Sequence, residues 1–205
     1  MIEEELKKMK TFSKNMRKHI LKAAFNGGAN SSHFGGALSS VEIVSALYSN
    51  VMNLSSVDIK DEKRDRFILS KGHACLVLYA ALVELNLINE KELETFEKND
   101  SRLLGHPVIN RDIGIEFTNG SLGMGLSLAT GVAIALLKKK LSAKVYVLLG
   151  DGECNEGSNW EAVMLAHSLQ LNNLTVIVDN NNYQQSGQNH EVLNIGKIAS
   201  IWKGF

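Results

Sequence analysis

The chain has 205 residues, of which 44% are hydrophobic, and equal numbers of basic and acidic side chains, 22 of each. This length suits one well-buried domain over residues 1–205, and the balanced charge excludes the basic field that binding to nucleic acid or an acidic membrane needs. Two cysteines without metal-type spacing, and no export or membrane-spanning segment, fit a reducing cytosol. We therefore expect a cytoplasmic protein that acts on small molecules.

The first half of the chain is predicted to be mainly helical. The expected elements are helices over residues 3–25, 40–52, 74–86 and 90–98, a short strand over 66–69, and a loop-rich segment over 99–119. Ser39 and Glu42 have the spacing of a capping box for the second helix. Its buried stripe would be Val44, Leu47, Tyr48 and Val51.

A glycine-rich segment, Gly120 to Gly125, opens an apolar helix that ends in Lys138, Lys139 and Lys140. Glycines let the backbone approach a ligand closely, and free N–H groups at a helix start favour anions. The alternative is helix–helix packing through small residues. We favour packing for Gly131 and leave both interpretations open for Gly123 and Gly125.

Two apolar runs, residues 144–149 and 174–178, are predicted to be buried strands. Residues 158–170 between them have a helical pattern, with Ser158 and Glu161 spaced as a capping box. A strand, a helix and a strand in this order form a βαβ unit with parallel strands. The predicted fold class is therefore α/β, with a parallel sheet flanked by helices.

Asp151 follows the first run in a Gly-Asp-Gly turn, and Asn181 follows the second run 30 residues later (181 − 151). Since parallel neighbouring strands end at the same edge of a sheet, these side chains should lie side by side, where open α/β sheets bind ligands. A carboxylate and an amide oxygen suit Mg²⁺ with a diphosphate. The alternative is that both are ordinary turn formers. We expect the Asp151 carboxylate to face solvent and to contribute little to the core.

Three histidines, His33, His73 and His106, lie at element junctions next to glycine-containing segments. Imidazole titrates near neutral pH, so this set fits proton transfer and the binding of oxygen-rich ligands. Single loop histidines are more often simply solvated. His19 and His167 are interpreted as structural, and His190 stays unassigned.

Taken in order, these motifs resemble the cofactor-diphosphate half of transketolase. Residues 29–48, 65–82 and 105–137 resemble the three histidine and glycine segments of that family, and residues 150–187 resemble its metal-binding segment. The resemblance implies a thiamine-diphosphate-binding fold, with thiamine diphosphate and Mg²⁺ as cofactors.

The resemblance also implies roles for particular residues. Asp151, Asn181 and the main-chain carbonyl of Tyr183 would hold Mg²⁺, and His33 and His106 would contact the sugar substrates. The other implied contacts with the cofactor are those of His73, Gly152 and Glu153 around the diphosphate and of Gly120, Ser121 and Leu122 along the two rings. Glu156 would couple the chain to a partner subunit near the carboxylate that activates the cofactor.

The implied function is transfer of a two-carbon ketol unit between sugar phosphates. The domain that binds the pyrimidine ring has no room in this chain, so the resemblance implies a separate C-terminal transketolase-like subunit, with two copies of each. The end of the chain at Phe205 leads us to expect that the sheet lacks its last strand.

Three alternatives stay open. Another thiamine-diphosphate enzyme, such as a 2-oxoacid dehydrogenase E1 component or 1-deoxyxylulose-5-phosphate synthase, would keep the metal motif but fits the histidine segments less well. A degenerate, non-catalytic scaffold subunit is favoured by Ser32 and Phe34, which depart from the family pattern around His33. A nucleotide-dependent transferase is disfavoured because no phosphate-loop motif occurs. The sequence does not identify the sugars or the partner.

Overall fold

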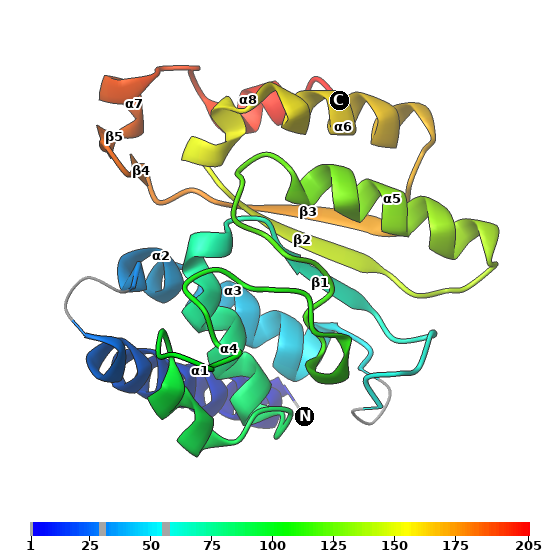
Figure 1. The fold of residues 1–205 in the computed structure, drawn as a ribbon. Helices are drawn as coiled ribbons and strands as arrows, with labels where there is room; N and C mark the ends of the chain where they lie inside the picture. The colour runs from blue at the N-terminus through cyan, green and yellow to red at the C-terminus, as the bar shows by residue number, and fades with distance from the viewer. Residues whose placement is uncertain (1, 29–31, 55–57) are drawn as a thin grey trace. The chain divides into compact units, whose positions relative to one another are not determined.

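The structure, a computed structural model, describes residues 2–28, 32–54 and 58–205 (Figure 1). The start of the first histidine segment, residues 29–31, lies outside the described residues. The chain divides into two compact units. We call residues 1–65 with 72–120 the helical unit, and residues 66–71 with 121–205 the sheet unit.

The helical unit is built on one long helix. Its elements are α1 (Ile2–Gly27), α2 (Phe34–Ser39), α3 (Val41–Ala46), the π-helical turn η1 (Leu47–Val51), the 3-10 turns η3 (Gly72–Ala74), η4 (Glu90–Thr95) and η5 (Arg111–Ile113), and α4 (Cys75–Glu84). Helix α1 packs against α3, α4 and η4. Met16 and Ile20 are fully buried on its inner face, so the predicted helix over residues 3–25 is confirmed.

The predicted helix over residues 40–52 forms as α3 followed directly by the π-helical turn η1, but its capping box is wrong. The hydroxyl groups of Ser39 and Ser40 both donate to the carbonyl of Gly36, at 3.1 and 3.0 Å. Ser39 therefore ends α2 instead of capping the next helix. The expected buried stripe holds for three of its four residues, but Val51 is 50% exposed.

Helix α4 is buried along nearly its whole length, as its uninterrupted apolar sequence predicts. Residues 90–98 are not the predicted α-helix, because only the 3-10 turn η4 forms there, with the side chain of Asn89 accepting from the Lys91 amide. His19 on α1 bonds to Glu84 at the end of α4 over 2.9 Å. This contact is consistent with the structural role expected for His19.

The sheet unit contains a three-stranded parallel sheet in the order β1 (Arg66–Leu69), β2 (Val145–Gly150), β3 (Leu174–Asp179). All residues of the central strand β2 are buried. Gly150 lies opposite Asp179 in the register of β2 and β3, so the two strands end together. The predicted βαβ unit and parallel sheet are confirmed.

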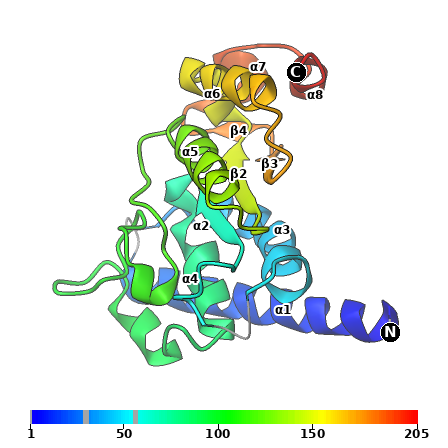
Figure 2. The same ribbon diagram turned by 90° about the vertical axis from the view of Figure 1, so that its right-hand side faces the viewer.

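Helices α5 (Gly125–Lys138) and α6 (Gly157–Ser168) pack against each other, and α5 also packs on the sheet (Figure 2). The short turn η6 (Gly152–Asn155) leads from β2 into α6. The hairpin of β4 (Tyr183–Gln184) and β5 (Gly187–Gln188) follows β3, and α7 (Asn189–Val192) and α8 (Ile198–Trp202) end the unit. Trp202 of α8 lies against Trp160 of α6, with ring centroids 5.3 Å apart.

Two sequence interpretations in this unit are wrong. Ser158 does not cap α6, because its hydroxyl donates to the Gly123 carbonyl over 2.9 Å and Glu156 occupies the N-cap position without a side-chain bond. The other concerns Gly131 of α5: outside the backbone of the helix itself, no described atom lies within 4 Å of a methyl group added there. The packing role favoured for Gly131 is therefore absent from the described chain.

Among the described residues, no helix combines the length and the apolar composition that a membrane crossing would require.

Candidate active site

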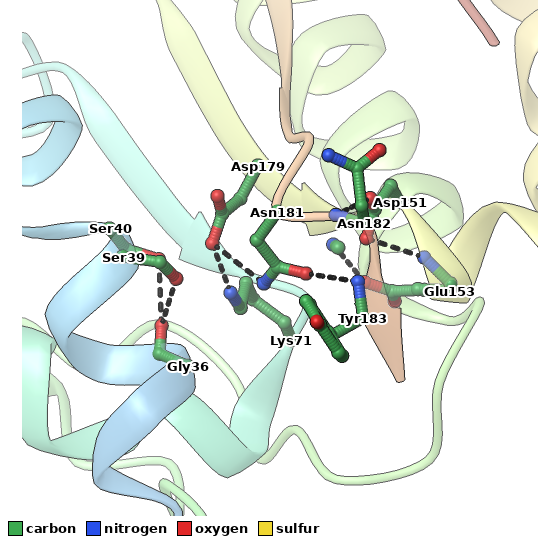
Figure 3. Close-up of polar contacts among 12 residues, drawn as sticks. Gly36, Ser39, Ser40, Lys71, Asp151, Glu153, Asp179, Asn181, Asn182 and Tyr183 are labelled. Carbon is green, nitrogen blue, oxygen red and sulfur yellow. Dashed lines mark hydrogen bonds and ion pairs between the residues drawn. The ribbon is translucent and has the colours of Figure 1, made fainter. Parts of the chain in front are cut away.

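The carboxyl ends of β2 and β3 bring Asp151 next to the segment that carries Asn181 (Figure 3). The Asp151 amide donates to the Asp179 carbonyl over 3.1 Å. In return, the Asn182 amide donates to Oδ2 of Asp151 over 2.6 Å. The register of the sheet thus produces the neighbourhood that the sequence predicts.

The Asp151 carboxylate does not face solvent as expected. The residue is only 5% exposed, and its second oxygen, Oδ1, accepts from the Gly152 amide over 2.9 Å. Its two backbone donors hold the carboxylate at the start of η6, so it also supports the local backbone. A substitution that removes its oxygens would disturb this turn as well as any ligand.

A buried ion pair lies beside this carboxylate in the sheet unit. Nζ of Lys71, just after β1, is 2.5 Å from Oδ2 of Asp179, at the end of β3. The side chains are 1% and 7% exposed. The Asn181 amide group also donates to Oδ2 of Asp179, over 3.4 Å, while its oxygen accepts from the Tyr183 amide over 2.9 Å. Sequence reasoning missed this pair, whose partners lie 108 residues apart.

The surroundings of Gly152 fit a bound anion and metal. A methyl group added at Gly152 would lie 2.8 Å from Cβ of Gln184 and 3.2 Å from Oδ1 of Asn189, so only glycine fits here. Nε2 of Gln184 and Oδ1 of Asn189 are buried and have no hydrogen-bond partner within the described chain. Unpaired buried polar atoms are costly unless a ligand or water satisfies them. The sequence analysis did not identify these two side chains.

The residues predicted to hold a metal would form a donor set for a hard cation. A carboxylate, an amide oxygen and a main-chain carbonyl suit Mg²⁺, which binds few protein ligands and completes its coordination with phosphate oxygens and water. Asp151, Asn181 and Tyr183 carry such groups and lie directly after β2 and β3, where the Asn181 oxygen accepts from the Tyr183 amide. No group of three or more His, Cys, Asp or Glu side chains that could hold a metal ion occurs in residues 2–28, 32–54 and 58–205.

The glycine segment before α5 is held by the turn that follows β2. The Gly123 amide donates to Oε1 of Glu153 over 2.9 Å, and the Gly123 carbonyl accepts from Ser158. Gly123 has a φ of +82°, and a methyl group there would lie 2.6 Å from Cβ of Glu156. A methyl group at Gly125 would lie 2.7 Å from Cα of Ser70. Close packing within the protein therefore requires both glycines.

The residues of this segment that the resemblance assigns to the cofactor are accessible. Gly120 and Ser121 are exposed, and Leu122 is 37% exposed. Glu153 is different, because it is only 2% exposed and both of its carboxylate oxygens accept hydrogen bonds from the protein. Burial raises the pKa of Glu153, and its hydrogen bonds oppose that shift.

The helical unit brings the three predicted histidines together. The ring centroid of His33 lies 5.7 Å from that of His73 and 6.4 Å from that of His106. Gly120 lies beside the His106 ring, since a methyl group there would be 3.3 Å from its Cδ2. His33 and His106 are exposed, and His73 is half-buried. The cluster can therefore offer several titratable nitrogens to one polar ligand.

The remaining histidines do not join this cluster. His167 is exposed on α6, and His190 is exposed in α7. His190 lines a cavity of about 380 Å³ in the sheet unit together with Asp151 and Lys197. Glu156, the predicted coupling residue, is exposed at the start of α6.

The chain is similar to several known proteins. Residues 16–199 match the family described as "Transketolase, thiamine diphosphate binding domain". An apulose-4-phosphate transketolase subunit from Actinobacillus succinogenes is 40% identical over 193 residues, which cover 94% of this chain and 70% of that protein. The 6-deoxy-6-sulfo-D-fructose transketolase subunit SqwG of a Clostridium species is 36% identical over 173 residues, 84% of this chain and 63% of that protein.

The solved structure of transketolase from Leishmania mexicana superposes with a TM-score of 0.86 at 28% identity. The match covers 96% of this chain but 30% of that one. The chain thus corresponds to most of the polypeptide of the two transketolase subunits, and to about a third of the transketolase from Leishmania mexicana.

Proposed function

The chain belongs to the transketolase family, whose thiamine diphosphate binding domain it matches over most of its length, and we propose that it is the cofactor-binding subunit of a split transketolase. With a partner subunit it transfers a two-carbon ketol unit between sugar phosphates. The observation that carries this proposal is the pairing of Asp151 with the Asn181 segment at the ends of two adjacent parallel strands.

In this proposal, Asp151, Asn181 and the carbonyl of Tyr183 hold Mg²⁺, and the Gly152 amide lies near the diphosphate. The negative charge of Asp151 supports cation binding. Gln184 and Asn189 add polar atoms whose hydrogen-bonding capacity is unused within the described chain. Thiamine diphosphate held by these residues would supply the nucleophile for ketol transfer.

The histidine cluster handles the sugar. His33 and His106 bind the hydroxyl groups of donor and acceptor and move their protons as general acids and bases. His73 contacts the diphosphate. The spacing of the three rings, 5.7 and 6.4 Å from His33, supports a shared ligand for the cluster.

The partner is a C-terminal transketolase-like chain in the cytoplasm, and two copies of each chain assemble. Two relatives are named as transketolase subunits, which supports a divided enzyme. Exposed Glu156 would meet the partner near the carboxylate that activates the cofactor. Gly120, Ser121 and Leu122, which are exposed on this chain, would line the two cofactor rings.

Reconstitution tests the proposal. This chain, the partner, thiamine diphosphate and Mg²⁺ should together transfer the ketol unit from a ketose phosphate to an aldose phosphate. Each chain alone, or the mixture with a chelator, should not. Calorimetry on the same mixture should show Mg²⁺-dependent binding of thiamine diphosphate. Robust turnover by the pure chain, or a mixture that binds no cofactor, would contradict the assignment.

A non-catalytic scaffold subunit is the second candidate. It is favoured by Phe34, a 50% exposed aromatic residue at the start of α2 next to His33. Such a scaffold would still bind the cofactor, so only ketol transfer with the partner separates the two candidates.

A further inference from the structure

One buried carboxylate in the sheet unit connects three separate backbone segments. Oε1 of Glu153 accepts from the Gly123 amide over 2.9 Å and from the hydroxyl of Ser70. Oε2 accepts from the Gly150 amide over 3.0 Å. Glu153 itself is 2% exposed. All these contacts lie within residues 66–71 and 121–205, which form a single compact unit.

Each connected segment is next to a residue with a proposed cofactor role or to the buried ion pair. Gly123 follows Ser121 and Leu122, and Gly150 precedes Asp151. Ser70 is the first residue after β1 and precedes Lys71 of that pair. One side chain therefore bridges the ring-lining segment and the metal-binding turn.

We propose that Glu153 is a positioning residue, whose carboxylate fixes the Leu122–Gly123 segment against the Gly150–Asp151 turn so that the cofactor's rings and its diphosphate are held in one geometry. This inference rests on the proposed function for the identity of the ligand. The role differs from direct cofactor contact, because the three donors already occupy both carboxylate oxygens and the side chain has almost no exposed surface.

The chemistry of the donors makes the carboxylate hard to replace. Backbone amides only donate, so Gly123 and Gly150 each need an acceptor on a different oxygen of Glu153. Glutamine has nearly the same shape, but one of its terminal atoms is an NH₂ group that cannot accept. In either amide orientation, Glu153→Gln would leave one of the two backbone N–H groups facing another donor. Only Ser70 could adapt, because a hydroxyl can also accept.

The first measurement is hydrogen–deuterium exchange on the cofactor-free complex of this chain with its partner. Glu153→Gln should accelerate exchange at Gly123 or Gly150 by about tenfold or more, the effect expected when one buried hydrogen bond is lost. Exchange in the middle of α5 and in β3 should stay unchanged. Glu191→Gln, which removes an exposed carboxylate from α7 of the same unit, is the matched control and should change neither region.

The second measurement separates positioning from general stability. In the assembled enzyme, Glu153→Gln should raise the KM for thiamine diphosphate about tenfold while kcat at saturating cofactor stays within about twofold, because bound cofactor restores the geometry. A group in contact with the reacting atoms would lower kcat instead. Glu153→Asp keeps the charge but is shorter by one methylene, so it cannot reach both amides and should show the same split.

The outcomes are distinct. Unchanged exchange at both glycines, or an unchanged KM for the cofactor, would overturn the proposal. If both Glu153 variants fail to fold, the residue is required for folding and the positioning role is wrong. If the wild-type complex binds no thiamine diphosphate, the proposed function fails, whereas the exchange result still reports whether Glu153 holds the two segments.

Discussion

The Lys71–Asp179 pair gives the sharpest stability prediction. Both side chains are almost fully buried and their charged atoms are 2.5 Å apart. Removing one partner of such a pair leaves the other charge, away from water, without the counter-charge 2.5 Å away, at a cost of about 3–5 kcal/mol. We expect Asp179→Leu and Lys71→Met each to lower the free energy of unfolding by this amount. For a domain of this size, the melting temperature would fall by roughly 6–20 °C.

The double variant Lys71→Met with Asp179→Leu is the decisive comparison. Replacing a buried ion pair by apolar side chains of similar volume is often neutral or stabilising, so the double variant should be more stable than either single variant. Urea unfolding, followed by circular dichroism, measures all four proteins. The reasoning would be refuted by additive losses, which would mean that the two charges do not compensate each other.

Three further predictions concern ligand, substrate and pH. Asp151→Asn keeps an oxygen that can accept from the turn, but it loses the negative charge. Mg²⁺-dependent cofactor binding, measured by calorimetry on the complex, should therefore weaken by more than about 100-fold. Equal affinity in a folded variant would contradict the metal assignment. His33→Ala and His106→Ala should each lower turnover by about 100-fold or more with cofactor affinity unchanged; full activity in both would support the scaffold alternative. Burial raises the pKa of the Cys154 thiol to about 12. The folded state therefore keeps this proton, whereas the unfolded thiol loses it above about pH 8.5. The free energy of unfolding should fall as pH rises above about 8.5, and it should fall less in Cys154→Ala. Identical pH dependence of the urea midpoint would count against that shift.

The features predicted best from the sequence depend on local patterns. The runs that form β2 and β3 are continuous and apolar, which is typical of strands buried on both faces. The rule that such units are parallel then places Asp151 beside the Asn181 segment. Three histidines at glycine-flanked junctions were likewise identified from the sequence, and His33 lies within 6.4 Å of the other two rings.

The features that sequence reasoning missed depend on partners far along the chain or on competing local bonds. The same hydroxyl that can cap a helix can bond elsewhere, and both predicted capping boxes failed for this reason. Ser39 donates to Gly36 within its own helix, whereas Ser158 donates to Gly123, 35 residues away. No spacing rule links Lys71 to Asp179 or Ser70 to Glu153, because tertiary packing alone brings them together.

Buried polar groups gather at the carboxyl ends of the strands, where the sequence predicts the ligand. Lys71, Asp151, Glu153 and Asp179 are all less than 9% exposed, although charged side chains are rarely buried unless they are paired. If these positions only stabilised the fold, apolar residues would be expected here, because apolar side chains in place of a buried ion pair often give equal or greater stability. Local departures from the rules of core packing are expected at functional sites. Lys71 and Asp179 pair with each other, whereas Asp151 and Glu153 accept hydrogen bonds from backbone amides of the turns around them. The two carboxylates thus hold the backbone where we propose that the ligand binds.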